Sequence, residues 1–371
     1  MTQNIIVFKE CAAQEKRVAL DPLVAKRFSD LGFSVTVTPN AGKQAFFPDE
    51  SYQDVAVKAP TFSENDIVLC VQSPSLETIE ALAPNSILVG LLNPYQNADV
   101  VKALQAKNIT SFAMELIPRI TRAQSMDALS SQATIVGYEG VLMAASLSPR
   151  LFPMLTTAAG TIRPAKVVVI GAGVAGLQAI GTARRLGAQV EAYDIRPDAK
   201  EQVESLGAKL IDTGVNAAGE GGYARELTEE EVAMQAAALK KHLSKAHAVI
   251  STAAVPGRKA PVIITEDMVE EMPAGSVIID LAAETGGNCA LTQVGKIVQY
   301  NNVTISGPVN VASRAALHAS EMYAKNIFNL LSPFMAEGQL TLDYDDEVIA
   351  QCLLTKDGKI VHERVRQTLE K

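Results

Sequence analysis

The chain has 371 residues, of which 48% are hydrophobic, 20% are charged and 5% are aromatic. This is the composition of a folded protein of two or three domains, and it excludes intrinsic disorder and collagen-like repeats. The net charge of −8 comes without a basic block, which makes a nucleic acid or an anionic membrane surface a poor partner. A small phosphate-bearing ligand stays open, because backbone N–H groups can hold it.

The sequence offers no targeting signal and no obvious metal ligands. The N-terminal segment has no long apolar run, and no stretch reaches the roughly 18 uninterrupted apolar residues of a membrane span. We therefore expect a cytoplasmic protein without direct membrane insertion. The four cysteines form no Cys-x-x-Cys pair, so buried free thiols are expected, and the four histidines lack metal-ligand spacing.

The N-terminal third of the chain alternates short apolar runs with helical stretches. Nearly continuous β-branched runs are typical of strands buried on both faces of a parallel sheet. The expected strands are Ile5–Phe8, Val35–Val37, Ile67–Val71, Ile87–Leu91 and Ser111–Ala113, and the expected helices are Pro22–Leu31, Leu76–Leu82 and Ala98–Lys107. This alternation predicts a sheet with helices on both sides.

Residues 114–165 form a connecting region rich in helix formers, after which the strand pattern begins again. The expected strands of this second unit are Val167–Ile170, Gln189–Tyr193, Lys209–Ile211, Ala248–Thr252, Val277–Leu281 and Thr304–Ser306. Apolar residues recur at helical spacing over Ala315–Leu331, and we expect this helix to cross back and pack on the first domain. Val348–Leu354 is predicted as an edge strand.

These patterns predict an α/β protein of two doubly wound, Rossmann-like domains with a nucleotide cleft between them. The expected N-terminal domain comprises residues 1–135 and a returning segment, 312–371. The expected dinucleotide-binding domain comprises residues 136–311.

A glycine-rich turn is the strongest motif in the sequence. The segment KVVVIGAGVAG, residues 166–176, is a strand that leads through G-x-G-x-x-G into a helix. Gly171 allows the tight turn, Gly173 lets a pyrophosphate approach the backbone, and Gly176 allows close packing of helix on strand. The alternative is a strand–helix turn that binds nothing, but the ordered context favours dinucleotide binding.

Asp194 directly follows the next predicted strand, where a carboxylate accepts hydrogen bonds from the adenosine ribose. A carboxylate at this position repels a 2′-phosphate, so the sequence favours NAD(H) over NADP(H). Arg196 is a counter-signal, because an arginine at this place can serve a 2′-phosphate.

A glycine-rich connection over residues 212–227 is long for a compact α/β unit, which indicates either a functional loop or a solvated linker. Thr228 and Glu231 then form the pattern of a capping box for a helix over Glu229–Leu243.

Several segments resemble domain I of the alpha subunit of proton-translocating NAD(P) transhydrogenase. The most specific is a signature loop, ELIPRITRAQSMDALSSQ, and the others are AAGT, GVAGLQAI, GGYA and IDLAAETGGN, at residues 115–132, 158–161, 173–180, 221–224 and 279–288. The resemblance covers nearly the whole chain. All segments but the signature loop are shared with alanine dehydrogenases.

Two positions separate these families. Alanine dehydrogenases use a lysine and a histidine of the N-terminal domain in substrate chemistry, and the matching positions here hold Gln72 and Asn93. Neither amide holds a proton that can be transferred near neutral pH, although Arg17 could still anchor a carboxylate. Hydride exchange between two nicotinamides needs no acid or base and depends on positioning.

The resemblance implies roles for individual residues. Gln124 resembles the residue that lies between the nicotinamide and the partner nucleotide, and Arg119 resembles the arginine near the nicotinamide ribose and phosphates. Asp127 resembles the carboxylate that pairs with this arginine, Ser130 the hydroxyl that contacts the carboxamide, and Tyr223 the aromatic contact of a mobile loop over the nucleotide. Further expected NAD(H) contacts are Ser125, Met126, Val174, Ile195 and Gly222. The alternative for the signature loop is an ordinary helix start with a surface ion pair.

The resemblance thus implies the NAD(H)-binding component of a transhydrogenase, of the type with a separate first alpha polypeptide or a shortened form of a longer chain. It implies hydride transfer between NADH on this chain and NADP+ on an NADP(H)-binding partner domain, a membrane domain on another chain, a homodimer and a place peripheral to the inner membrane. Other hypotheses are an alanine dehydrogenase-like enzyme, a reductase of the saccharopine or lysine pathway, and a non-catalytic NAD sensor.

Overall fold

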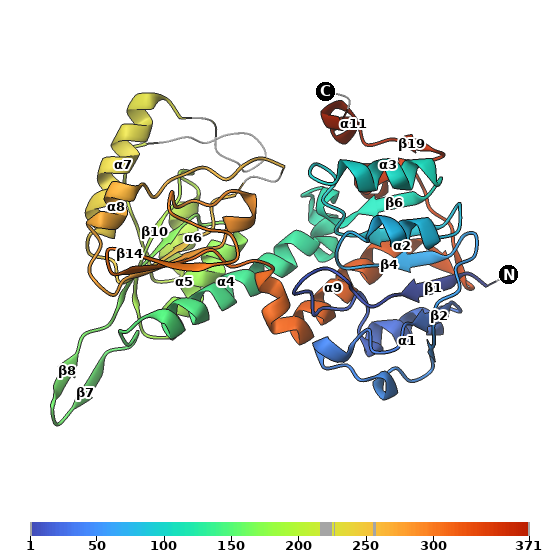
Figure 1. Ribbon diagram of the computed structural model, residues 1–371, viewed down its shortest axis with the longest axis horizontal. Helices are drawn as coiled ribbons and strands as arrows, with labels where there is room; N and C mark the ends of the chain where they lie inside the picture. Colours follow the sequence, from blue (N-terminus) through green and yellow to red (C-terminus); the bar gives the residue numbers. More distant parts are fainter. Residues whose placement is uncertain (1, 216–224, 226, 255–256, 370–371) are drawn as a thin grey trace. The chain divides into compact units, whose positions relative to one another are not determined.

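The computed structural model describes residues 2–215, 225, 227–254 and 257–369. The chain divides into two units, of which unit 1 comprises Met1–Gln132 with Ala312–Lys371, and unit 2 comprises Ala133–Val311 (Figure 1). No helix in these described ranges is long and apolar enough to cross a membrane.

Unit 1 is built on one eight-stranded sheet in the order β19-β18-β6-β5-β4-β1-β2-β3. Strands β1 to β6 are parallel to one another, and the C-terminal strands β18 and β19 add an antiparallel edge. The strands are β1 Asn4–Val7, β2 Ser34–Val37, β3 Ala56–Val57, β4 Ile67–Leu69, β5 Ile87–Gly90, β6 Thr110–Ala113, β18 Leu353–Lys356 and β19 Lys359–Ile360.

Helices cover both faces of this sheet, as the alternating pattern predicted. The helices are α1 Pro22–Asp30, α2 Leu76–Ala81, α3 Ala98–Ala106, α9 Ala316–Leu331, α10 Glu347–Cys352 and α11 Glu363–Leu369. Because side chains alternate along a strand, Ile5 and Val7 enter one core layer and Ile6 enters the other. The expected return of the chain is confirmed, since Tyr323 and Ile327 of α9 are fully buried in the first of these layers.

The prediction of an edge strand over Val348–Leu354 was wrong. Its N-terminal portion is helix α10, which begins where Asp346 accepts hydrogen bonds from the N–H groups of Val348 and Ile349. The strand β18 follows, and it lies inside the sheet between β6 and β19. An apolar run of this length fits a buried helix segment as well as a strand, and the N-cap at Asp346 decided the outcome.

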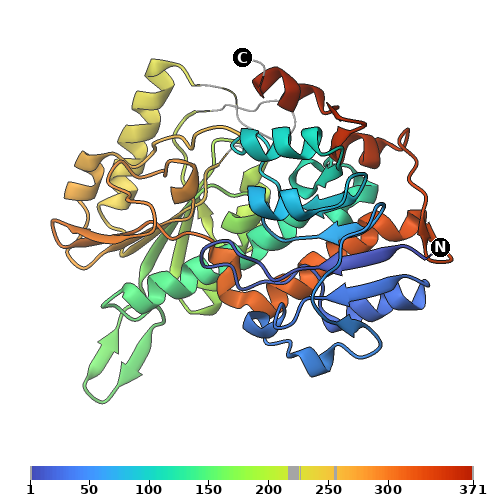
Figure 2. The same cartoon turned by 45° about the vertical axis from the view of Figure 1, so that its right-hand side comes forward.

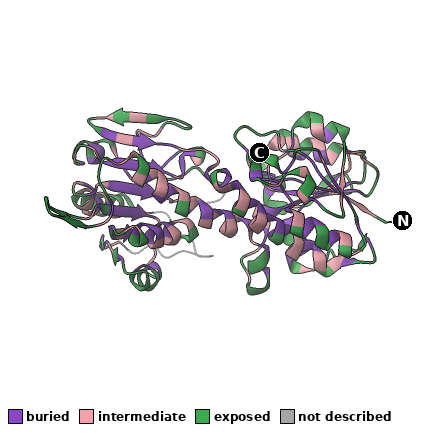
Figure 3. Ribbon diagram, turned by 90° about the horizontal axis from the view of Figure 1, so that it is seen from below, coloured by how far each residue is buried: buried purple, intermediate pink, exposed green. Residues whose placement is uncertain are grey.

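Unit 2 is built on a seven-stranded sheet in the order β11-β10-β9-β12-β13-β15-β14. All neighbours are parallel except β14, which pairs antiparallel with β15. The strands are β9 Lys166–Ile170, β10 Gln189–Tyr193, β11 Lys209–Leu210, β12 Ala248–Ser251, β13 Val277–Asp280, β14 Ile297–Tyr300 and β15 Val303–Ser306. The central strands are buried on both faces (Figure 3).

The helices of unit 2 are α5 Val174–Arg185, α6 Ala199–Ser205, α7 Glu229–Leu243 and α8 Glu266–Glu270, and α4 Ala128–Leu147 runs across the division between the units. The capping box at the start of α7 is confirmed, because Thr228 and Glu231 exchange side-chain-to-backbone hydrogen bonds. Gly137 lets α4 approach α5 closely, since a Cβ there would lie 2.1 Å from the carbonyl oxygen of Ala175.

Two small antiparallel pairs were not predicted from the sequence. The hairpin of β7 Leu155–Thr157 and β8 Gly160–Ile162 extends away from the sheet of unit 2 (Figures 1 and 2), and β16 Met335–Ala336 pairs with β17 Gln339–Leu340. Single turns of 3-10 helix lie at Lys43–Ala45, Asp49–Ser51, Met114–Leu116, Ala283–Thr285 and Ser332–Phe334, with longer ones at Thr121–Met126 and Val311–Ala315.

Candidate functional site

The glycine turn of unit 2 joins β9 to α5 at the point where the chain reverses its direction across the sheet. Strands β10 and β11 lie on one side of β9, and β12 and β13 lie on the other, so the carboxyl end of β9 is a topological switch point. Ligands of doubly wound sheets bind in the crevice at such points.

Each glycine of this turn has a distinct steric reason. Gly171 has a φ of +90°, and a Cβ there would lie 2.7 Å from the hydroxyl of Thr252. A Cβ on Gly176 would lie 1.8 Å from the carbonyl oxygen of Gly171, so only glycine allows α5 to pack this closely on the turn. A Cβ on Gly173 would meet nothing within 4 Å. The open side of the turn is therefore at Gly173, which is the place expected for a pyrophosphate.

The start of α5 adds hydrogen-bond donors to this open side. Gly173 is the N-cap residue and provides no side chain to cap the first N–H groups, and the next residue, Val174, is 43% exposed. Uncapped N–H groups at a helix N-terminus, together with the helix dipole, suit a phosphate anion. The residues of the turn thus fit a dinucleotide.

Asp194 follows β10 and is held against the glycine turn. Its carboxylate accepts a hydrogen bond of 2.7 Å from the N–H of Ala172. Arg196 pairs with the same carboxylate through Nε and Nη2, both at 2.9 Å, while Ile195 packs partly buried against the core of unit 2. Burial alone would raise the pKa of Asp194, but the hydrogen bonds and charge of Arg196 outweigh it and lower this pKa. Asp194 is therefore ionised at neutral pH.

The arginine that the sequence marked as a counter-signal thus serves Asp194. The guanidinium of Arg196 also donates to the carbonyl oxygen of Ala172, 3.3 Å away, so it spans the carboxylate and the turn. A guanidinium engaged in this way is bound by the chain's own acid, and Asp194 keeps its charge beside the turn.

The loop after β12 is fixed beside the same turn by two buried residues to which the sequence assigned no role. Asn288 donates to the carbonyl oxygens of Ala253 and Pro261 at 2.7 and 2.8 Å and accepts from the N–H of Ala253 at 3.0 Å. Asp280, at the end of β13, accepts from the N–H of Asn288 at 2.7 Å. Both residues are fully buried, so this loop has a defined place next to Gly171.

The signature loop lies in unit 1 between β6 and α4. Ala123 and Met126 are buried in the core, whereas Gln124 and Ser125 between them are exposed, so the loop presents these two side chains outward. Arg119 precedes this turn of 3-10 helix and is also exposed.

Asp127 and Ser130 are brought together by the start of α4. The Asp127 carboxylate accepts from the Ser130 N–H at 2.9 Å and from its hydroxyl at 2.6 Å, which is the arrangement of a helix N-cap. Gly222 and Tyr223 of the predicted mobile loop lie outside the described residues.

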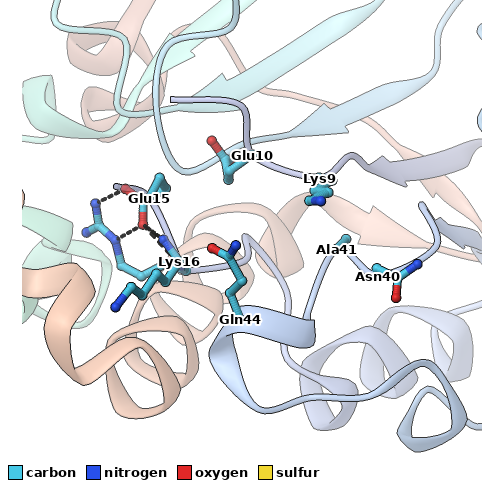
Figure 4. A pocket seen from close by; sticks show the side chains of 8 residues that line it. Lys9, Glu10, Glu15, Lys16, Asn40, Ala41 and Gln44 are labelled. Carbon is cyan, nitrogen blue, oxygen red and sulfur yellow. Dashed lines mark hydrogen bonds and ion pairs between the residues drawn. The ribbon is translucent and has the colours of Figure 1, made fainter. Parts of the chain in front are cut away.

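Unit 1 has its own switch point between β1 and β4, and side chains fill it. Glu10, after β1, accepts hydrogen bonds from the N–H groups of Val71 and Gln72, after β4, at 2.6 and 3.2 Å. The remaining pocket has a volume of about 10 Å³, which is room for about one water molecule (Figure 4). It is lined by Lys9, Glu10, Glu15, Lys16, Arg17, Asn40, Ala41 and Gln44.

Arg17 is bound by the protein itself. Its Nε and Nη2 donate to the two oxygens of Glu15 at 2.8 and 2.6 Å, and its Nη1 donates to Gln132 at 2.8 Å. Gln72 adds a third donor to the same carboxylate at 3.0 Å. Burial raises the pKa of Glu15, but the hydrogen bonds and charge of Arg17 dominate and lower it to about 2. The pair is thus ionised and internally satisfied.

Two buried carboxyl groups contact the positions that hold the lysine and histidine of an alanine dehydrogenase. Glu10 accepts from the backbone of Gln72, and Glu115 accepts from the backbone of Asn93. Burial raises the pKa of each of these two carboxyl groups to about 7, in spite of the backbone hydrogen bonds. The side-chain amide of Asn93 donates to Gln96. Gln72 and Asn93 are therefore parts of hydrogen-bond networks within unit 1.

The cysteines partly depart from expectation. All four are free thiols, and Cys70, Cys289 and Cys352 are buried, but Cys11 is exposed. Among the described residues, no three His, Cys, Asp or Glu side chains gather as a metal site.

Comparisons with known proteins agree with the fold and the motifs. The family description "Alanine dehydrogenase/PNT, N-terminal domain" matches residues 6–136, and "Alanine dehydrogenase/PNT, C-terminal domain" matches residues 140–363. These matches define the class of doubly wound α/β protein to which the two units correspond.

More similar relatives narrow this class. The first of the separate alpha-subunit polypeptides of NAD(P) transhydrogenase from Rickettsia prowazekii is 44% identical, over 99% of this chain and 98% of the relative. Its counterpart from Rhodospirillum rubrum is 46% identical, over 97% and 98%. The crystal structure of transhydrogenase from Sinorhizobium meliloti has a TM-score of 0.88 and 42% identity, covering 97% of this chain and 100% of that one. The chain belongs to the NAD(P) transhydrogenase alpha-subunit branch of the alanine dehydrogenase/PNT family.

Proposed function

We propose that this chain is the NAD(H)-binding component of a proton-translocating NAD(P) transhydrogenase and that unit 2 binds the nucleotide. The observation that carries the proposal is the glycine turn, open at Gly173 and flanked by the ionised carboxylate of Asp194. The N-terminus of α5 would hold the pyrophosphate, and Asp194 would accept hydrogen bonds from the ribose hydroxyls. The negative charge of Asp194 disfavours a 2′-phosphate and hence favours NAD(H).

The signature loop supplies the remaining contacts of the proposed site. Gln124 and Ser125 are presented outward by their buried neighbours, and Met126 and Asp127 follow them in the same turn. We assign Gln124 to the approach of the two nicotinamides, Arg119 to the ribose and phosphates, and Asp127 with Ser130 to the carboxamide. The hydrogen-bonded pair of Asp127 and Ser130 fixes both groups at the start of α4, which suits a positioning role. Tyr223 and Gly222 keep their proposed roles in the loop that covers the nucleotide.

The proposed reaction needs positioning and no proton transfer. When bound, the dihydronicotinamide of NADH supplies a hydride to NADP+ on a partner domain. The amide of Gln124, the hydroxyl of Ser130 and the backbone of the glycine turn orient without titrating near neutral pH. Arg17, which an amino acid dehydrogenase would use to anchor a carboxylate, is instead bound by Glu15 inside unit 1.

The proposed partners are an NADP(H)-binding domain and a membrane domain on other chains, which would place this chain at the inner membrane as a peripheral component. The names of the relatives, which describe one piece of a divided alpha subunit, support such an assembly. We also propose a homodimer. The hairpin of β7 and β8 supports a second copy as its partner, because Met154, Leu155 and Ile162 are exposed and a two-stranded hairpin is marginal by itself.

The test is to mix the purified chain with a partner domain loaded with NADPH and to follow reduction of the acetylpyridine analogue of NAD+. The proposal predicts rapid reduction that requires both proteins. NADH binding without any reduction would support the NAD sensor, and deamination of L-alanine by the chain alone would support the dehydrogenase. Light scattering of the same sample gives the oligomeric state, and a monomer would contradict the proposed dimer.

A further inference from the structure

Two asparagines of α9 converge on the signature loop. Asn326 and Asn329 each donate a side-chain hydrogen bond to the carbonyl oxygen of Ser125, at 2.9 and 3.0 Å. The two residues are three positions apart, so they lie on the same face of the helix. A carbonyl oxygen has two lone pairs, and both are used here.

The bond from Asn326 is itself held in place. The hydroxyl of Ser131, in the first turn of α4, donates to the Asn326 carbonyl oxygen at 2.6 Å. Asn326 is 6% exposed, so this amide is buried and fixed from both sides. The loop, α4 and α9 are thereby joined at one side chain, although about 200 residues separate Asn326 from the loop in the sequence.

The tethered carbonyl belongs to the residue next to Gln124. The side chains of Gln124 and Ser125 are exposed, while the flanking Ala123 and Met126 are buried in the core. The loop is therefore anchored by apolar contacts on either side and by the two amide bonds at its centre. A further ion pair of 2.9 Å joins Arg122 to Asp346, but Arg122 is half exposed, so this contact is weak.

We infer that Asn326 and Asn329 are positioning residues that set the place of Gln124 for hydride transfer. This inference rests on the proposed function. Nucleotide affinity would come mainly from the glycine turn and Asp194 of unit 2, whereas hydride transfer depends on fine placement of Gln124. A displacement of about 1 Å in a catalytic site can cost roughly a hundredfold in rate. Loss of the two amides therefore lowers the rate of transfer more than the affinity for NADH.

The experiment compares Asn329→Ala, Asn326→Ala/Asn329→Ala and the unaltered chain, each with the NADPH-loaded partner domain. We expect the single variant to transfer hydride a few times more slowly and the double variant to lose roughly tenfold or more. The dissociation constant for NADH should stay within about threefold, because Asp194 and the glycine turn are intact. NADH fluorescence can measure this constant without interference, since the chain has no tryptophan.

A second readout follows the loop without any partner. Met126 is buried beside the tethered carbonyl, so its methyl resonance in a methionine-labelled sample should shift or broaden in both variants, while that of the core residue Met114 should not. Asn97→Ala is the matched control, because its amide makes the same kind of bond, 3.0 Å to the carbonyl oxygen of Leu92, at the start of α3. This control should leave the rate and the Met126 resonance unchanged.

An unchanged Met126 resonance in the double variant would overturn the inference, as would equal losses of transfer rate and NADH affinity, which would indicate a merely structural role. If the unaltered chain transfers no hydride, the proposed function fails, but the methyl resonance still tests the tether. If the double variant does not fold, Asn329→Ala, at a half-buried position, carries the comparison.

Discussion

The two units share one sheet topology and use its switch point in opposite ways. In unit 1 the edge between β1 and β4 is occupied by Glu10, Glu15, Arg17 and Gln72, which satisfy one another and leave room for about one water molecule. In unit 2 the edge at β9 carries a glycine turn, with nothing within 4 Å of the side that Gly173 presents. Long charged side chains close the first crevice, and the absence of side chains opens the second.

This difference shows why fold alone does not locate a site. Both sheets obey the rule that ligands bind at the carboxyl ends of strands where the chain reverses direction, but only one of them has backbone donors facing outward there. The buried pair of Glu15 and Arg17 takes up the bidentate contacts that a substrate carboxylate would otherwise use. The local side chains, rather than the topology, assign the nucleotide to unit 2.

The strongest way to break the comparison is to close the open turn. Gly173→Asp introduces a negative charge where the pyrophosphate is expected, and a Cβ meets no obstacle there. NADH affinity should fall by about a hundredfold or more, since charge repulsion replaces a favourable helix N-terminus, while the melting temperature stays close to that of the unaltered chain. Titration of NADH fluorescence measures this, with Gly181→Ala on the same helix as the control. Unchanged affinity would place the nucleotide elsewhere.

Opening the filled crevice should cost stability instead. Glu15→Ala leaves the guanidinium of Arg17 buried without its carboxylate, and removal of one partner of a buried ion pair typically costs about 3–5 kcal/mol. Denaturant unfolding measures the change, and NADH affinity should be unaffected. Lys26→Ala removes an exposed ion pair and should change the free energy of unfolding by less than about 1 kcal/mol. Equal effects of the two substitutions would show that the pair in unit 1 does not act as a buried one.

Asp194→Asn sharpens the nucleotide preference of unit 2. The substitution removes the charge that repels a 2′-phosphate and releases Arg196 from its salt bridge. We expect NADH affinity to fall by roughly tenfold and NADPH affinity to rise, since a bidentate contact to the ribose is lost and a guanidinium becomes available. Parallel titrations with the two nucleotides measure the ratio. A ratio that does not change would remove Asp194 from the ribose site.

The smallest effect concerns the pH dependence of unit 1. Burial raises the pKa of Glu10 to about 7 in the folded chain, above its ordinary value of 4.5, so the folded state holds the extra proton between these pH values. The stabilisation from this proton is complete below about pH 4.5 and is lost as the pH rises through 7. Glu10→Gln should therefore lose less stability than the unaltered chain between pH 5 and pH 8. Melting temperatures across this range decide it, and identical slopes would contradict the buried position of Glu10.

The regular elements of the fold could be predicted because they depend on local patterns. The strand Gln189–Tyr193 and the helix Glu229–Leu243 have the predicted bounds, since an apolar run and a capping box determine them locally. The edge strand β14 escaped prediction because it is half exposed and pairs antiparallel at the margin of the sheet. Val348–Leu354 was misassigned because an apolar run does not reveal whether it is helical.

The candidate site divides in the same way. Gly171, Gly173, Gly176 and Asp194 could be identified from spacing, because the turn is a contiguous piece of chain. The contacts of Asn288 with Ala253, and of Asn326 and Asn329 with Ser125, join distant segments. No local pattern announces such pairs, since an asparagine on a helix or in a loop is most often solvated. Only the tertiary structure brings them together.

Hydrogen exchange in the presence and absence of NADH tests the assignment of the nucleotide to unit 2 most directly. The account predicts that NADH slows exchange of the backbone amides from Ala172 to Ala175 and leaves those of Val71 and Gln72 unchanged. Protection of Val71 and Gln72 without protection at the glycine turn would contradict it.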